Sequence, residues 1–137
     1  MDRGRPISTR EPARPTDAEL EILRVLWRRG PSTVRAVHQS LLHFRPVGYT
    51  TVLKLLQIMT EKGLVRRDVS TRSHVYAAAI SEVITQRRMV WDLARRVFGG
   101  STLGLVLHAL SAVPATPKEL DRIRKLLDER TRKRGSL

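Results

Sequence analysis

Apolar side chains recur every three or four positions in three stretches of the first half of the chain, which is the spacing of amphipathic helices. The first predicted helix starts at Thr16, because Thr16 and Glu19 have the spacing of a capping box, and it ends at Gly30. The second is short and takes Ser32 as its cap, and the third covers residues 49–62. The apolar faces of these helices comprise Leu20, Leu23, Leu26 and Trp27, then Val34, Val37 and Leu41, then Val52, Leu55, Leu56 and Met59.

The pattern after the third helix changes from helical to strand-like. Residues 64–69 and 74–78 are two short strand-like runs, and the polar stretch 70–73 between them has the composition of a hairpin tip. Three helices followed by a hairpin is the element order of a winged helix-turn-helix domain, which we expect over residues 16–80. Residues 1–15 precede it as a flexible basic arm, because their closely spaced prolines forbid a helix.

The rest of the chain has helical periodicity only. We expect helices over residues 82–98 and 102–110, separated by a pair of glycines. A last helix starts at Pro117, behind a second capping box, and its basic end at residues 130–134 is expected to fray. The predicted fold class is therefore mainly α, with a small β-hairpin wing and a helical region after it.

These last three helices have apolar faces but too little bulk to bury them alone. A homodimer is the simplest solution, because a two-fold partner supplies the missing half of the core. The alternative is a tail that folds back on its own domain. We expect a dimerisation region over residues 81–131, followed by a basic tail at 132–137. The positions expected at the dimer interface are Val90, Leu93, Val97, Leu103, Val106, Leu107, Leu110, Leu120, Ile123 and Leu127.

Charge indicates the class of partner. The chain has 26 Lys and Arg against 13 Asp and Glu, a formal net charge of +13, which favours a polyanion such as nucleic acid or an anionic membrane surface. No apolar run is long enough to span a membrane, and the start of the chain lacks the apolar core of a secretory signal. We therefore expect a cytoplasmic protein without membrane insertion.

The third helix is the expected recognition helix, because its polar face lies opposite its apolar stripe. Thr51 and Lys54 suit phosphate or base contacts, and Gln57 has the amide that reads a base edge. The hairpin arginines are expected at phosphates or in the adjacent minor groove. The residues placed at or near DNA on these grounds are Thr50, Thr51, Leu53, Lys54, Gln57, Arg66, Arg67 and Arg72. Three helices and a hairpin also suit a plain protein-interaction module, which stays open as the alternative.

Enzyme chemistry has no support in the sequence. The absence of Cys excludes disulfides, thiolate metal ligation and cysteine nucleophiles, and there is no phosphate-binding loop or serine nucleophile motif. A metal needs converging ligands, whereas the histidines fall on four different elements. No enzyme activity, cofactor or metal is therefore expected. The histidines are His38, His43, His74 and His108.

Several stretches, in order and spacing, resemble the BlaI/MecI/CopY penicillinase-repressor family over about residues 15–130. Ser32, Thr33, Arg35 and Tyr49, which lie within these stretches, are also expected to contact DNA. The matching stretches are Pro15-Thr16-Asp17-Ala18-Glu19-Leu20-Glu21-Ile22-Leu23 with Leu26-Trp27, Ser32-Thr33-Val34-Arg35, Tyr49-Thr50-Thr51-Val52, Glu61-Lys62-Gly63-Leu64-Val65, Tyr76, Phe98-Gly99-Gly100-Ser101 with Leu105-Val106-Leu107, and Glu119 to Leu127.

The resemblance implies a dimeric repressor that binds palindromic operators upstream of β-lactamase or other resistance genes. It also implies a membrane-bound sensor protease whose signal leads to cleavage of the dimerisation region, after an Asn that follows a Leu-Val-Leu-like run. This sequence has His108-Ala109 there, so the candidate cleavage point departs from the family pattern. Leu53 stands where some relatives have a basic residue, and the lack of Cys argues against copper sensing. A basic architectural protein that coats DNA without sequence preference is the alternative function.

Overall fold

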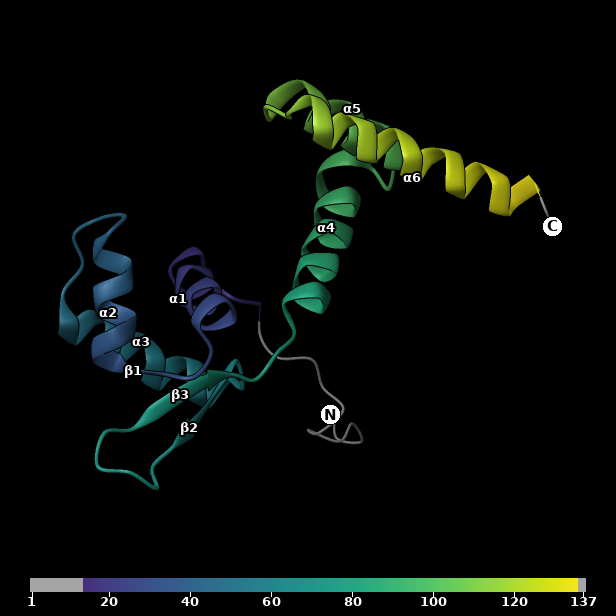
Figure 1. The fold of residues 1–137 in the computed structure, drawn as a ribbon. Helices are drawn as coiled ribbons and strands as arrows, with labels where there is room; N and C mark the ends of the chain where they lie inside the picture. The colour runs from purple at the N-terminus through teal and green to yellow at the C-terminus, as the bar shows by residue number, and fades with distance from the viewer. Residues whose placement is uncertain (1–13, 136–137) are drawn as a thin grey trace, which may run out of the picture. The chain divides into compact units, whose positions relative to one another are not determined.

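The computed structural model describes residues 14–135, which divide into two compact units at Arg87 (Figure 1). Each unit is described by itself. The expected arm at residues 1–15 lies almost wholly outside the described residues, as do residues 136–137. The first unit has the element order α1, β1, α2, α3, β2, β3, and the second is formed by helices.

Helix α1 (Asp17–Arg29) begins and ends where the sequence predicts. The Thr16 hydroxyl accepts from the Glu19 amide at 3.2 Å and the Glu19 carboxylate accepts from the Thr16 amide at 2.9 Å, which completes the capping box. Gly30 stops the helix with a φ of 86°. At the same end the Trp27 indole donates to the Ile80 carbonyl at 3.0 Å, so the chain leaving the sheet is fastened to α1.

Ser32 does not cap the second helix, which corrects the sequence prediction. Ser32 and Thr33 form a two-residue strand, β1 (Ser32–Thr33), and the Ser32 hydroxyl donates to the Gly30 carbonyl at 2.9 Å. Thr33 is the cap instead, because its hydroxyl accepts from the Ala36 amide at 3.1 Å. Helix α2 (Val34–Leu42) then buries the predicted apolar face.

Helix α3 (Tyr49–Lys62) has the predicted bounds, and Gly63 ends it in the left-handed conformation with a φ of 82°. Val52, Leu56 and Met59 are fully buried, whereas Leu55 of the predicted stripe is only partly buried. These side chains join those of α1 and α2 in one apolar core, and each of the three helices packs on the other two.

Strands β2 (Val65–Asp68) and β3 (Val75–Ala78) form the predicted hairpin, but the sheet has a third member. The strand order is β1-β3-β2, and both pairings are antiparallel. Tyr76 lies opposite Ser32 on one side and Arg67 on the other, and its side chain is 1% exposed. The base of the wing is therefore part of the core.

A buried ion pair joins the first turn of α1 to the last turn of α3. Glu19 is 2% exposed, and its Oε1 lies 2.7 Å from the Nζ of Lys62 at the end of α3. Burial raises the pKa of Glu19, but the hydrogen bonds from Lys62 and Thr16 outweigh it, so the pKa lies below its ordinary value. The carboxylate is therefore ionised at neutral pH, and its Oε1 accepts from both Lys62 and Thr16.

The remaining helices are α4 (Glu82–Phe98), α5 (Thr102–Ala112) and α6 (Pro117–Gly135). Thr85 of α4 is buried in the first unit, and the second unit starts at Arg88. Gly99 and Gly100, with φ of 58° and 84°, separate α4 from α5 as predicted. The capping box at Thr116 is present, and helix α6 continues to Gly135, so residues 130–134, which were expected to fray, are helical in this structure. Cations in a last helical turn favour the helix through its dipole.

No helix within residues 14–135 is long and apolar enough to cross a membrane.

Candidate nucleic-acid interface

The polar face of α3 is open to solvent. Thr50, Thr51, Lys54 and Gln57 are all exposed, while the opposite face is buried in the core. Leu53 is partly buried and packs on the core, so its side chain is less available than the other predicted contacts. A helix held by its apolar face with small polar groups and one cation outward has the arrangement needed to enter a major groove.

The N-terminus of α3 differs from those of α1, α2, α5 and α6, which begin with a side-chain hydrogen bond to a backbone amide. Its cap is Gly48, which has no side chain to supply, and the first helical bond runs from the Val52 amide to the Gly48 carbonyl. The amides of the first turn are therefore available to an external acceptor. A helix N-terminus of this kind favours a phosphate, through its free N–H groups and its dipole.

His38 on α2 holds the loop that leads into α3 and contacts the first residue of that helix. Its Nε2 donates to the Val47 carbonyl at 2.7 Å, and its ring meets the Tyr49 ring edge-on with centroids 5.8 Å apart. Tyr49, a predicted DNA contact, is 47% exposed. The role of His38 could not be predicted from the sequence, because only the folded loop brings the Val47 carbonyl within reach of the ring.

The start of α2 offers fewer contacts than predicted. Ser32 is only 6% exposed, and its hydroxyl is engaged by Gly30, so the expected DNA contact through this side chain is not supported. The Thr33 hydroxyl accepts from the Ala36 amide, which leaves its O–H able to donate to an external acceptor. Arg35 is exposed and remains a candidate for a phosphate contact.

The wing arginines do not share one face. Arg66 lies opposite Ala77 and Arg67 lies opposite Tyr76, and successive side chains of a strand point to opposite sides of a sheet. Both are exposed, but they lie on opposite faces of the sheet, with Arg67 on the same face as Tyr76. A DNA surface on one side of the wing therefore cannot be contacted by both arginines in the same way. This division follows from their consecutive positions in a predicted strand.

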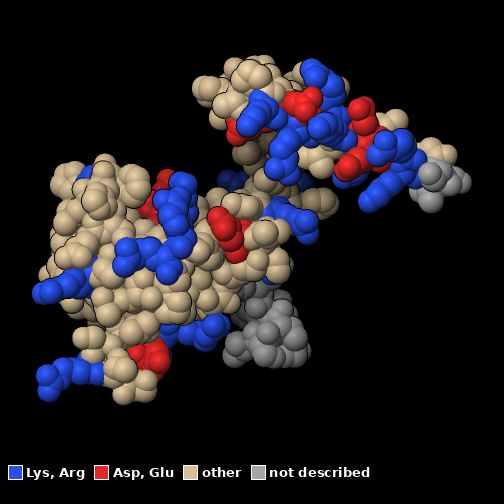
Figure 2. Space-filling view, viewed as in Figure 1, with Lys and Arg blue, Asp and Glu red and all other residues tan. Residues whose placement is uncertain are grey.

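The tip of the wing is ordered by short hydrogen bonds. Asp68 accepts from the Ser70 amide at 2.9 Å, and the Thr71 hydroxyl donates to the Ser73 carbonyl at 2.6 Å. Hydrogen bonding from Ser70 holds the pKa of Asp68 below its ordinary value. Arg72 extends from this turn and is exposed. Figure 2 shows Lys and Arg side chains over the visible face of the first unit, including the hairpin drawn at its lower left.

Helices α5 and α6 bury none of their described side chains. The exposed fractions of the predicted interface residues include 69% for Leu103, 55% for Leu107 and 58% for Leu127. His108 lies within α5, and its ring packs against that of Phe98 with centroids 5.4 Å apart. The described residues contain no cluster of three or more His, Asp or Glu side chains able to hold a metal ion.

The chain is similar to a family model and to several known proteins. The penicillinase repressor family model matches residues 15–129. The transcriptional regulator BlaI of Mycobacterium tuberculosis H37Rv is 35% identical over 115 residues, which are 82% of each chain. The penicillinase repressor of Staphylococcus aureus is 19% identical over 116 residues, which cover 85% of this chain and 92% of that protein.

Two solved structures are also similar to the chain. One is the DNA-binding domain of the repressor BlaI, with a TM-score of 0.48 and 25% identity over 53% of this chain and 89% of that one. The other is monomeric Bacillus licheniformis BlaI in complex with the blaP half-operator, with a TM-score of 0.47 and 25% identity over 53% and 88% of the two chains.

Proposed function

This chain belongs to the penicillinase repressor family, and from that premise we propose that it represses transcription by binding palindromic operator DNA as a homodimer. The family consists of transcriptional repressors and not of enzymes. The observation that best supports operator binding is the exposed polar face of α3, beside a helix N-terminus that no side chain of residues 14–135 caps.

In this proposal the two parts of the interface have different roles. Lys54 and Gln57 meet base edges or the adjacent phosphates from α3, since both are exposed on its polar face. Arg72 at the wing tip and Arg35 at the start of α2 contact phosphates, which positions α3 without reading sequence. The large positive charge adds affinity that falls with salt.

The proposed dimer interface lies on the helices of the second unit. Its helices leave a row of large apolar side chains exposed, including Leu103 and Leu107 one turn apart on α5. Exposed apolar patches of this kind mark interaction surfaces, and a second copy of the chain offers a matching surface under two-fold symmetry. A two-fold dimer presents two copies of α3 to the two halves of a palindrome.

Release of the repressor is a separate part of the proposal. A sensor protease that cuts between His108 and Ala109 must first unwind α5, because both residues are helical. The contact between His108 and Phe98 opposes that unwinding. Mass spectrometry of the chain after exposure to the sensor protease locates the cut, and a fragment that ends elsewhere rules out this bond as the cleavage point.

Operator binding is tested by footprinting the purified chain on the DNA upstream of its own gene, with random duplex as competitor at matched salt. We expect a protected palindrome. Lys54→Gln should reduce the ratio of specific to random affinity. If Lys54 reads a base, the loss corresponds to roughly 1–3 kcal/mol of specific binding free energy. Lys118→Gln, which removes an exposed cation from α6, is the matched control and should leave that ratio unchanged.

The alternative function, a basic protein that coats DNA, is favoured by the net charge of +13. It predicts equal affinity for the upstream DNA and for random duplex. It also predicts that Lys54→Gln and Lys118→Gln weaken binding equally, because only the lost charge counts.

A further inference from the structure

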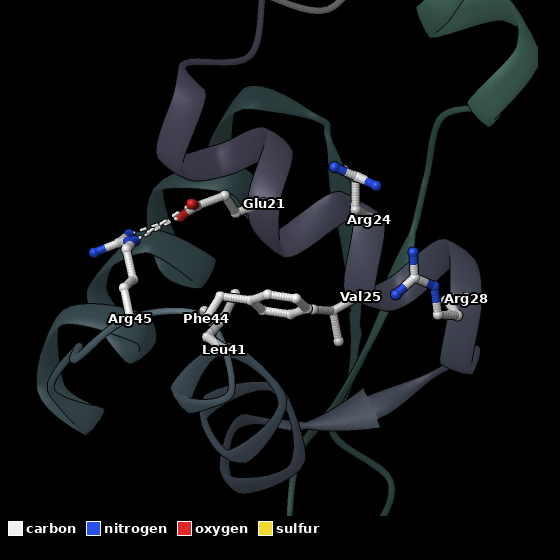
Figure 3. Close-up of a pocket in the computed structure, with 7 residues that line it drawn as sticks. All are labelled: Glu21, Arg24, Val25, Arg28, Leu41, Phe44 and Arg45. Atoms are coloured by element: carbon white, nitrogen blue, oxygen red, sulfur yellow. Dashed lines mark hydrogen bonds and ion pairs between the residues drawn. The ribbon is translucent and has the colours of Figure 1, made fainter. Parts of the chain in front are cut away.

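A cavity of about 210 Å³ opens in the first unit between α1 and the end of α2. None of its lining residues belongs to α3 or to the hairpin, so the proposed DNA interface does not account for it. Its walls combine a small apolar floor with a rim of cations (Figure 3).

The floor is formed by side chains from both helices. Val25 and Leu41 are buried members of the core, whereas Phe44, in the loop after α2, is 71% exposed. Figure 3 shows the Phe44 ring extending toward Val25. Binding is favoured when a ligand's apolar surface covers an exposed aromatic ring beside an apolar floor, because both apolar surfaces leave water.

The rim has more positive than negative charge. Arg45 donates to Glu21 through three contacts, of 2.7, 3.1 and 3.3 Å, so these two charges neutralise each other. Arg24 and Arg28 are one turn apart on α1, on the same side of the helix. Both are exposed, and within residues 14–135 neither forms an ion pair.

We propose that this cavity binds a small organic acid, with one aromatic or branched aliphatic body on Phe44 and a carboxylate held by Arg24 and Arg28. The volume supports a small ligand, because pockets for drug-sized molecules measure roughly 300–1,000 Å³. An inorganic anion leaves the floor uncovered, and a neutral aromatic molecule leaves both guanidinium groups unpaired. Guanidinium and carboxylate match in geometry as well as charge.

The experiment titrates the full chain with 3-phenylpropionate by calorimetry and follows backbone amide shifts by NMR, without DNA. Two probes separate the parts of the ligand: acetate has the charge without the ring, and 3-phenylpropionamide has the ring without the charge. We expect saturable binding of 3-phenylpropionate alone, with shifts concentrated around residues 21–28 and 41–45. Shifts concentrated on α3 or in residues 88–135, or equal binding of the amide, would overturn the proposal.

Variants of exposed residues test the assignment without threatening the core. Arg24→Gln/Arg28→Gln should weaken binding about tenfold or more, since charge-assisted hydrogen bonds are stronger than neutral ones. Arg29→Gln/Arg87→Gln removes the same charge from exposed positions in the same unit and should leave the affinity unchanged. Phe44→Ala should weaken binding, and Glu21→Gln should strengthen it by freeing Arg45 for the ligand.

Equal losses of affinity in the two double variants would mean that only the net charge of the chain matters, and would overturn the assignment of Arg24 and Arg28 to the site. Weaker binding after Glu21→Gln would overturn the arrangement of the rim. Because the titration contains no DNA, its result does not depend on whether the chain binds an operator.

Discussion

The ammonium group of Lys62, in the last turn of α3, lies 2.7 Å from a carboxylate oxygen of Glu19, in the first turn of α1. The same oxygen accepts the Thr16 amide at 2.9 Å, so one carboxylate closes the capping box and joins two helices. Glu19→Gln should lower the free energy of unfolding of the first unit by about 1–3 kcal/mol, because it leaves the Lys62 charge poorly partnered.

The measurement is urea unfolding in a Trp91→Phe background, so that Trp27 fluorescence reports the first unit. Glu21→Gln is the matched control, because it breaks an ion pair of the same length whose two side chains are 41% and 43% exposed. Surface pairs of this kind contribute little. Equal losses in the two variants would show that burial of the Glu19–Lys62 pair adds nothing.

The stability difference between the wild type and Glu19→Gln should depend on pH. The pKa of Glu19 is lowered in the folded chain, so its contribution is complete above the unfolded pKa of about 4.3 and is lost as pH falls toward the folded pKa. We expect a larger difference at pH 7 than at pH 3, measured by urea unfolding at both. Glu21 and Asp68, whose pKa values are also lowered, affect both proteins equally and cancel. A difference that does not change with pH contradicts the assignment.

His38→Phe should weaken specific DNA binding while leaving the fold intact. The substitution keeps a ring against Tyr49 but removes the hydrogen bond to the Val47 carbonyl, which holds the loop before α3. We expect about a three- to tenfold loss of operator affinity, the equivalent of one hydrogen bond, by fluorescence anisotropy. His43→Phe changes an exposed histidine of the same loop and should have no effect. Equal affinity of the two variants would rule out a positioning role.

Arg72→Gln should flatten the salt dependence of DNA binding. Loss of one phosphate contact reduces the slope of log K against log salt by about 1 and weakens binding to all sequences alike. Anisotropy titrations at several salt concentrations measure this slope. Arg122→Gln, an exposed cation on α6, is the control. An unchanged slope for Arg72→Gln means that the wing tip does not touch DNA.

Leu103→Asp combined with Leu107→Asp should convert the dimer to a monomer, because two charges one turn apart on α5 have to be buried at the proposed interface. Sedimentation equilibrium gives the mass, to be compared with 15.6 kDa for one chain. Val69→Asp introduces a charge at an exposed apolar position of the wing and should not change the mass. A wild-type chain that sediments as a monomer contradicts the dimer proposal itself.

Features set by neighbouring residues could be predicted from the sequence, and those set by distant ones could not. The capping box at Thr16 and the stop at Gly63 each depend on a few consecutive residues, and both are present. The choice between Ser32 and Thr33 as the cap of α2 depends on the pairing of β1 with β3, far along the chain. Nothing local distinguishes two adjacent hydroxyl residues.

The candidate site divides in the same way. The polar face of α3 follows from its helical period, so Lys54 and Gln57 could be identified as exposed. The contacts of His38 and the burial of Ser32 depend on tertiary packing. The cavity beside Phe44 also had no signal in the sequence, because its floor and rim come from residues that only the folded loop brings together.

The 1% exposure of Tyr76 limits how this fold can be altered. A hairpin whose base supplies a core residue and pairs with the α1–α2 connection cannot be exchanged as a separate module between proteins. A chimera that transplants β2 and β3 must also transplant the side chains that surround Tyr76, or it leaves a void in the core. The exposed tip at residues 69–74 has no such constraint, so length variation among repressors of this kind should concentrate there.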